Sequence, residues 1–218
     1  MKLYFSPLAC SLASRIALYE TGAAAELVEV DPKTKKTSDG RSFLDVHPLG
    51  LVPLLETDDG MLLSENAAIL QWLAQGTDLA PDSGPDRARF HQWLGFIGTE
   101  LHKAVFVPLL DAKAPKDAKT YALSKAETRL TWLESHLTGR EHLLDRFTVA
   151  DGYLFTVLNW AIVTPISLDR HPAIRAYHKR MRARPHVDRA FGEERVLYAK
   201  ELARHAATSV MQYVTGQG

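Results

Sequence analysis

Hydrophobic and polar residues alternate in two short segments near the N-terminus, and a segment with helical spacing separates them. Lys2–Phe5 alternates and predicts a short strand, which Pro7 ends. Residues 11–21 carry apolar side chains at steps of three and four, which predicts a helix with Gly22 as its C-terminal stop. Residues 26–30 alternate again. A strand, a helix and a strand within about 30 residues are typical of a βαβ unit, so the two strands are predicted to be parallel.

The pattern of short elements continues up to about residue 74. Four further elements are predicted, a short helix, two strands and a longer helix, at 42–46, 53–56, 61–63 and 64–74. Asp58-Asp59-Gly60 between the two strands is a hairpin turn signal. Ser64 is predicted to cap the longer helix. This half of the chain therefore mixes strands and helices.

The second half shows no strand pattern. Gly76, Pro81, Gly84 and Pro85 interrupt the regular spacing and indicate a linker. Helices are predicted at 86–107, at 116–137, from Thr148-Val149-Ala150-Asp151 onward, between 172 and 184, and from there to about 213. Thr148 and Asp151 have the spacing of a capping box, and Pro108 is expected to end or kink the first of these helices. The sequence predicts an α/β domain at 1–76, a linker at 77–85 and an all-helical domain at 86–218.

Composition limits the classes of function. The chain has 218 residues, of which 46% are hydrophobic, enough for a sizeable core and one or two domains. Its 26 basic and 26 acidic residues balance, which argues against a nucleic-acid partner. No apolar run approaches the ~20 residues of a membrane span, and the N-terminus does not resemble a signal peptide. A single cysteine excludes an internal disulfide and suits a reducing cytosol, and no Cys/His spacing predicts a metal site.

Val52-Pro53 is the most informative dipeptide of the first domain. X–Pro bonds are the only peptide bonds that become cis at modest cost, and a cis bond here turns the backbone of Val52 outward, free to pair with an extended peptide. Cys10 lies at the start of the first predicted helix, where unpaired N–H groups favour a thiolate on or near it. The plainer interpretation of Cys10 is a small buried residue. The two features together suggest a glutathione site.

Two further groups of residues are candidates for binding. Ser64-Glu65-Asn66 follows a strand and opens a helix, so it is either a simple cap or an anion site for a ligand carboxylate, with Glu65 near the ligand's ammonium group. In the long helix, a stripe of mostly small residues is formed by Gly95, Gly98, Thr99 and His102. Glycine destabilises a helix by roughly 0.5–1 kcal/mol relative to alanine, so something is expected to approach this stripe closely. The stripe is either a contact surface for another helix or the floor of a ligand site, in which His102 is a hydrogen-bond donor or a base.

The chain resembles the beta-class, bacterial-type glutathione transferases. The segments that carry the resemblance are Met1-Lys2-Leu3-Tyr4, Ala9-Cys10-Ser11-Leu12, Val30-Asp31, Lys35-Lys36, Gly50-Leu51-Val52-Pro53, Glu65, Thr99-Glu100-Leu101-His102-Lys103, Phe147-Thr148-Val149-Ala150-Asp151 and Tyr153-Leu154-Phe155. The resemblance implies a thioredoxin-like N-terminal domain, a helical-bundle C-terminal domain, a cytoplasmic homodimer, and glutathione as cosubstrate.

The resemblance also implies roles for individual residues. Cys10 and His102 are the implied catalytic residues, with Cys10 beside the glutathione sulfur, able to hydrogen-bond it or to form a mixed disulfide. The residues implied to bind glutathione are Lys35, Val52, Pro53, Glu65, Asn66 and Thr99. Among these, Val52 pairs its backbone with the cysteinyl part, Glu65 and Asn66 hold the γ-glutamyl end, and Lys35 meets the glycine carboxylate.

Three functions follow from this set of residues. The first is conjugation of the glutathione thiolate to small apolar electrophiles, with no metal. The second is glutathione-dependent thiol–disulfide exchange or reductive dehalogenation through Cys10. The third is a non-catalytic carrier of apolar ligands, because Gly95 and Leu49 depart from the family pattern.

Overall fold

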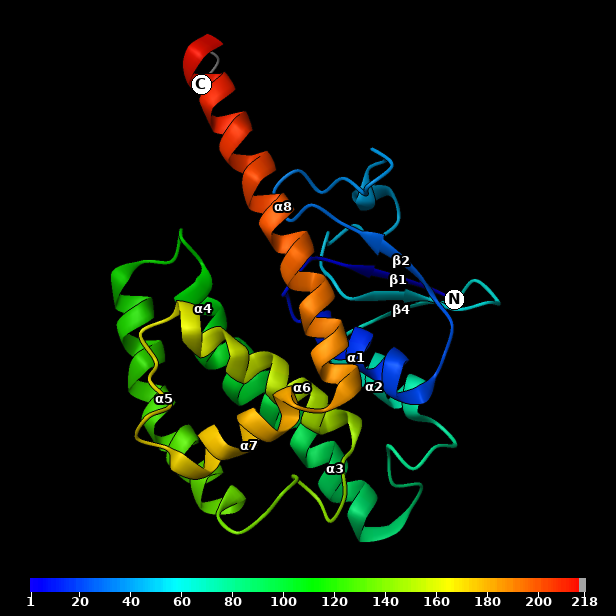
Figure 1. Cartoon of the computed structure of the whole chain (residues 1–218), viewed down its shortest axis with the longest axis vertical. Coiled ribbons are helices and arrows are strands. Elements are labelled where there is room, and N and C mark those ends of the chain that lie inside the picture. The colour runs from blue at the N-terminus through cyan, green and yellow to red at the C-terminus, as the bar shows by residue number, and fades with distance from the viewer. Residues whose placement is uncertain (216–218) are drawn as a thin grey trace.

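A four-stranded sheet forms the centre of the N-terminal half. The computed structural model describes the backbone of residues 1–215 and the side chains of residues 1–207. The strands are β1 (Lys2–Phe5), β2 (Glu26–Glu29), β3 (Leu54–Glu56) and β4 (Leu62–Ser64), in the order β2-β1-β3-β4. β1 runs parallel to β2, as predicted, and antiparallel to β3, which pairs antiparallel with β4 (Figure 1).

Helices lie on both faces of this sheet because the side chains of β1 alternate. Leu3 and Phe5 belong to the main core, which the helices α1 (Leu12–Thr21) and α2 (Asn66–Ala74) share. Tyr4 points to the other face, where its ring lies 5.3 Å from that of Phe43 in the short helix η1 (Phe43–Asp45). The predicted mixed domain is therefore confirmed.

Two local signals at helix ends had different outcomes. Gly22 stops α1 as predicted, with φ of 69° and its N–H bonded to the carbonyls of Leu18 and Tyr19. The prediction that α2 begins at Ser64 is wrong, because Ser64 pairs with Leu54 as the last residue of β4. Glu65, with φ of 68°, forms the N-cap of α2 instead.

The C-terminal half is helical, as predicted. Its elements are α3 (Gly84–Phe96), η2 (Ile97–Phe106), α4 (Val107–Leu110), α5 (Lys116–Leu137), α6 (Val149–Asn159), η3 (Trp160–Val163), α7 (Pro172–Arg182) and α8 (Pro185–Thr215). α3 begins at Gly84, inside the predicted linker, because proline is well tolerated in the first turn of a helix. η2 is a π-helix, so the helical pitch changes at Ile97 and again at Val107, directly before Pro108, which lies in the first turn of α4.

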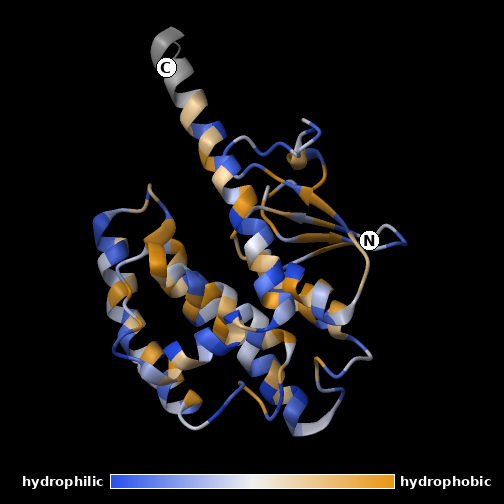
Figure 2. Ribbon diagram, viewed as in Figure 1, coloured by the Kyte–Doolittle hydropathy of each residue, from blue (hydrophilic) through white to orange (hydrophobic). Residues whose placement is uncertain are grey.

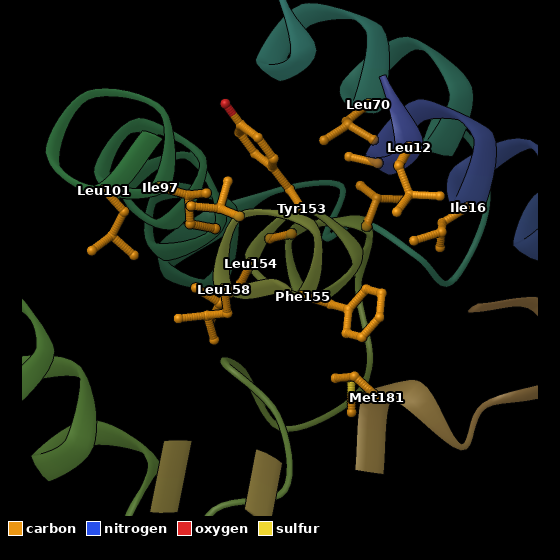
Figure 3. Packing of buried hydrophobic residues seen from close by; sticks show 14 of the residues in the cluster. Leu12, Ile16, Leu70, Ile97, Leu101, Tyr153, Leu154, Phe155, Leu158 and Met181 are labelled. Atoms are coloured by element: carbon orange, nitrogen blue, oxygen red, sulfur yellow. The ribbon is translucent and has the colours of Figure 1, made fainter. Parts of the chain in front are cut away.

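α6 is the central helix of the molecule. All of its residues are buried, and its neighbours include α1, α2, α7 and η2. Figure 3 shows Leu154 and Leu158 projecting from one side of α6 and Phe155 from another. Figure 2 shows the sheet strands coloured mainly as hydrophobic, whereas the more peripheral α5 alternates between blue and orange. The predicted capping box is present, since Asp151 Oδ2 accepts the Thr148 N–H at 2.8 Å.

None of the helices in the described part of the chain combines the length and apolar character that a membrane crossing requires.

Candidate functional site

A cavity of about 440 Å³ brings together most of the predicted site residues. Of the eight residues predicted to act on glutathione, the cavity is lined by Cys10, Val52, Pro53, Glu65, Asn66, Thr99 and His102. The eighth, Lys35, is not among the lining residues. A second hollow of about 510 Å³, between α2 and α3, contains none of the eight. Residues far apart in the sequence thus converge on one site.

Cys10, Val52 and Asn66 form a hydrogen-bonded group on one wall. The Val52–Pro53 bond is cis, as predicted. The Cys10 thiol donates to the Val52 carbonyl oxygen, with 3.2 Å between Sγ and O. The Asn66 side-chain amide donates to the Cys10 carbonyl oxygen at 3.0 Å, and the Ser14 hydroxyl donates to Asn66 Oδ1 at the same distance. Asn66 therefore fixes the start of α2 relative to the start of α1.

The Cys10 thiol is not activated in the way that its place near a helix start suggested. Burial raises its pKa to about 11, and the opposing effect of the nearby Lys103 charge is smaller. The expectation of a thiolate on Cys10 itself is therefore wrong, because desolvation outweighs the favourable local charges. At neutral pH the side chain is a neutral S–H donor facing the cavity.

Alkylation of Cys10 by iodoacetamide is expected to be slow at neutral pH and to accelerate up to about pH 11, because only the thiolate reacts. A free cysteine titrates near pH ~8.5. Cys10 is the only cysteine, so the mass of the labelled protein reports on it alone. Protein unfolded in urea is the control, with a midpoint near that of the free amino acid. A plateau below pH 9 in the folded protein would contradict the raised pKa.

His102 lines the same cavity from η2 and contacts Tyr153, a residue to which the sequence assigned no role in the site. Its Nδ1 lies 2.8 Å from the hydroxyl oxygen of Tyr153, which comes from α6 and also lines the cavity. Figure 3 shows the Tyr153 hydroxyl pointing away from the other labelled side chains of the core. Burial, and then the charge of Lys103, lower the pKa of His102 to about 4, so the ring is neutral at neutral pH. Burial raises the pKa of Tyr153 above its usual value.

Tyr153 could have been suspected from the sequence on one ground. It is a polar-tipped side chain within a mainly apolar helix, and buried tyrosine hydroxyls usually find a hydrogen-bond partner. His47 and Lys103 also line the cavity, and no spacing in the sequence indicated either of them.

All four residues of the stripe predicted on the long helix line the cavity. Gly95, Gly98, Thr99 and His102 are all lining residues, which favours the ligand-floor interpretation over a helix contact. A Cβ atom added to Gly95 would meet nothing within 4 Å, so no neighbouring element is packed against it. The Thr99 hydroxyl donates to the Gly95 carbonyl oxygen at 2.9 Å.

The start of α2 presents polar groups to the same cavity. Ser64, Glu65 and Asn66 are lining residues, at the end of the helix where backbone N–H groups are unpaired by the helix itself. The charge of Glu65 raises the pKa of Tyr153, in addition to burial, so its carboxylate acts on the interior of the cavity. This arrangement suits a ligand group that carries both an ammonium and a carboxylate.

Lys35 lies outside the cavity but close to its edge. The aliphatic part of its side chain passes Gly50, since Lys35 Cδ lies 3.3 Å from the point where a Gly50 Cβ would be. Leu51 and Val52, the next residues, line the cavity. In the described part of the chain, His, Cys, Asp and Glu side chains form no group of three or more that could hold a metal ion.

The chain is similar to glutathione S-transferases of known sequence. The chain matches two family models, "Glutathione S-transferase, N-terminal domain" over residues 1–75 and "Glutathione S-transferase, C-terminal domain" over residues 99–185. It is 41% identical over 200 residues to the glutathione S-transferase GstA of Escherichia coli O157:H7, covering 89% of this chain and 98% of that protein.

Solved structures agree with these matches. A sphingomonad glutathione S-transferase complexed with glutathione is 43% identical, with a TM-score of 0.85, covering 89% of this chain and 98% of its own. A beta-class glutathione S-transferase from Sphingomonas chungbukensis is 43% identical, with a TM-score of 0.84 and the same coverage.

Proposed function

The chain belongs to the glutathione S-transferase family, and from this premise we propose that glutathione occupies the cavity around Cys10 and that its thiolate attacks small apolar electrophiles there. The protein is a glutathione S-transferase with glutathione as its cosubstrate. The observation that carries the residue assignments is the hydrogen-bonded group of Cys10, Val52 and Asn66, which lines the same cavity as His102.

The geometry supports a specific pose for glutathione. The cysteinyl part pairs with the backbone at Val52–Pro53, and the γ-glutamyl carboxylate lies at the N-terminus of α2 beside Asn66. Glu65 faces the ligand's ammonium group. Thr99 of η2 contributes to the lining of the same cavity.

In this pose the neutral Cys10 thiol donates its proton to the glutathione sulfur instead of to the Val52 carbonyl. A hydrogen bond to the ionised form of a group lowers its pKa, so the ligand thiolate is favoured. His102, held by Tyr153, lines the same cavity, where its neutral ring accepts or donates a hydrogen bond. The electrophile takes up the remaining volume near Leu51 and Val107.

The two alternative functions are less well supported. Thiol–disulfide exchange or reductive dehalogenation through Cys10 needs its thiolate, and a pKa of about 11 leaves little thiolate at neutral pH. A carrier without catalysis is disfavoured because two curated relatives are glutathione S-transferases and seven of the eight predicted residues line one cavity.

We also propose that residues 1–76 form the glutathione-binding domain, 77–85 the linker and 86–218 the helical domain of a cytoplasmic homodimer. Leu62 on β4 and Trp72 on α2 are large apolar residues that are 48% and 42% exposed, which suits a contact between copies. Light scattering coupled to size-exclusion chromatography tests this, with a mass of twice 24.3 kDa expected.

Glutathione is expected to bind the purified protein at millimolar concentration or below, as measured by calorimetry. Conjugation is then expected with at least one of several aryl halides and epoxides. Binding without conjugation of any of them would contradict the proposed apolar electrophile. Absence of binding would contradict the placement of glutathione in this cavity.

A further inference from the structure

Three polar side chains lie together where the C-terminal part of α8 passes the first domain, and two of them, Arg204 and His205, pair with residues of that domain. These are Glu201, Arg204 and His205, and they lie beyond residue 185, where the second family match ends. Arg204 Nη2 lies 2.6 Å from Glu29 Oε1, at the end of β2. His205 Nε2 lies 2.8 Å from Asp31 Oδ2, and His205 Nδ1 lies 3.9 Å from Glu201 Oε1. Figure 1 shows α8 passing beside the segment that follows β2.

Asp31, the partner of His205, organises the turn that carries Lys35. Its Oδ1 accepts the backbone N–H groups of Lys33 and Thr34, each at 2.9 Å. Its backbone carbonyl accepts the Lys35 N–H at 3.0 Å, and its N–H donates to the Lys36 carbonyl at 2.9 Å. One carboxylate thus holds the turn with one oxygen and the C-terminal helix with the other.

Lys35 depends on this turn for its position. It has φ of 56°, in the left-handed region that non-glycine residues rarely adopt, so the surrounding hydrogen bonds must hold it there. Its carbonyl accepts the Phe43 N–H at 2.8 Å, and its side chain passes Gly50 at the edge of the cavity. A shift of Asp31 would therefore displace the Lys35 ammonium group relative to the cavity.

The contact between His205 and Asp31 is largely shielded from water. The two side chains are 14% and 17% exposed, which makes the pair less subject to screening than an exposed one. Burial by itself raises the pKa of Asp31, but the backbone N–H of Thr34, the His205 ring and the N–H of Lys33 lower it to about 2. Asp31 is thus an ionised carboxylate at neutral pH, bound from both sides.

We infer that the 201–205 segment of α8 is a brace that sets the position of Lys35, so that His205 and Arg204 are positioning residues for the carboxylate at the glycine end of glutathione. The inference rests on the proposed binding of that carboxylate by Lys35. It assigns a role in glutathione binding to a part of α8 that neither family match covers.

His205→Ala is expected to raise the KM for glutathione roughly three- to tenfold, the range for loss of one typical intramolecular hydrogen bond, with kcat unchanged. His205→Gln keeps a donor near Asp31 and is expected to restore most of the affinity. The matched control is His186→Ala, an exposed histidine in the first turn of the same helix, which should leave KM unchanged. Equal KM values for the Ala and Gln variants would overturn the inference.

Lys35→Ala separates the inference from the proposed function. If Lys35→Ala leaves KM for glutathione unchanged, the proposed role of Lys35 fails. If it raises KM while His205→Ala does not, the brace fails and the glutathione site stands. The double variant should resemble Lys35→Ala alone, because His205 acts through Lys35. If the increase in KM for glutathione in the double variant equals the product of the two single increases, the brace is overturned.

Discussion

Asp151→Ala is expected to lower the free energy of unfolding by about 3–5 kcal/mol, a loss typical of breaking a buried polar network. The Asp151 carboxylate is fully buried. It accepts hydrogen bonds from the Leu143 N–H at 2.9 Å, the Thr148 N–H at 2.8 Å and the Tyr177 hydroxyl at 2.9 Å. Each buried donor left without a partner costs about 1–3 kcal/mol. The three donors come from the loop before α6, from its N-cap and from α7, so one substitution loosens three elements.

Urea unfolding followed by circular dichroism measures this effect through the shift of the midpoint. Asp145→Ala is the matched control, since Asp145 is exposed on the same loop and should shift the midpoint little. Asp151→Asn should fall between the two, because its amide oxygen can accept some of the bonds while its NH₂ group opposes others. Equal midpoints for Asp151→Ala and Asp145→Ala would show that the network is not important for stability.

The capping box at Thr148 and Asp151 shows what the sequence predicted well. Its signal lies within four residues, and the structure forms it as predicted. The parallel β1–β2 pair and the stop of α1 at Gly22 were also predicted correctly. The first depends on local spacing, and the second depends on one residue with special backbone freedom. The α/β half and the helical half followed from these local patterns.

The errors have causes that are not local. Ser64 is a good helix cap, but pairing with β3 keeps it in the sheet, and the N-cap moves to Glu65. The place near a helix start predicted a thiolate on or near Cys10, and the first of these is wrong, because burial, which depends on the whole fold, raises the pKa of the Cys10 thiol. Both outcomes depend on neighbours that are distant in the sequence.

In the candidate site, too, features with a local sequence signal were predicted and features that depend on distant residues were missed. The cavity residues that resemble a family pattern were found from the sequence, and the structure brings seven of the eight to one cavity. Tyr153 was missed because its role depends on a partner 51 residues away, His102. The contact of α8 with Asp31 spans 174 residues, and no periodicity or motif in a single sequence indicates it.

Cys10→Ser is expected to keep at least part of the conjugating activity and to abolish any glutathione-dependent disulfide reduction. A serine hydroxyl is also a hydrogen-bond donor, so it can stabilise the glutathione thiolate in the way proposed for the neutral Cys10 thiol. It cannot form a disulfide, and the chain has no other cysteine to replace it. Conjugation and disulfide-reduction assays on the same preparation measure both activities, with glutathione affinity determined by calorimetry.

Cys10→Ala is the companion variant, because it removes the donor as well as the sulfur. Conjugation is expected to fall further in Cys10→Ala than in Cys10→Ser, and the pH at which half of the bound glutathione is ionised should rise only when the donor is lost. If both variants bind glutathione normally but neither conjugates, the sulfur of Cys10 takes part in the reaction chemically. The proposed role of Cys10 as a simple hydrogen-bond donor to the glutathione thiolate would then be wrong.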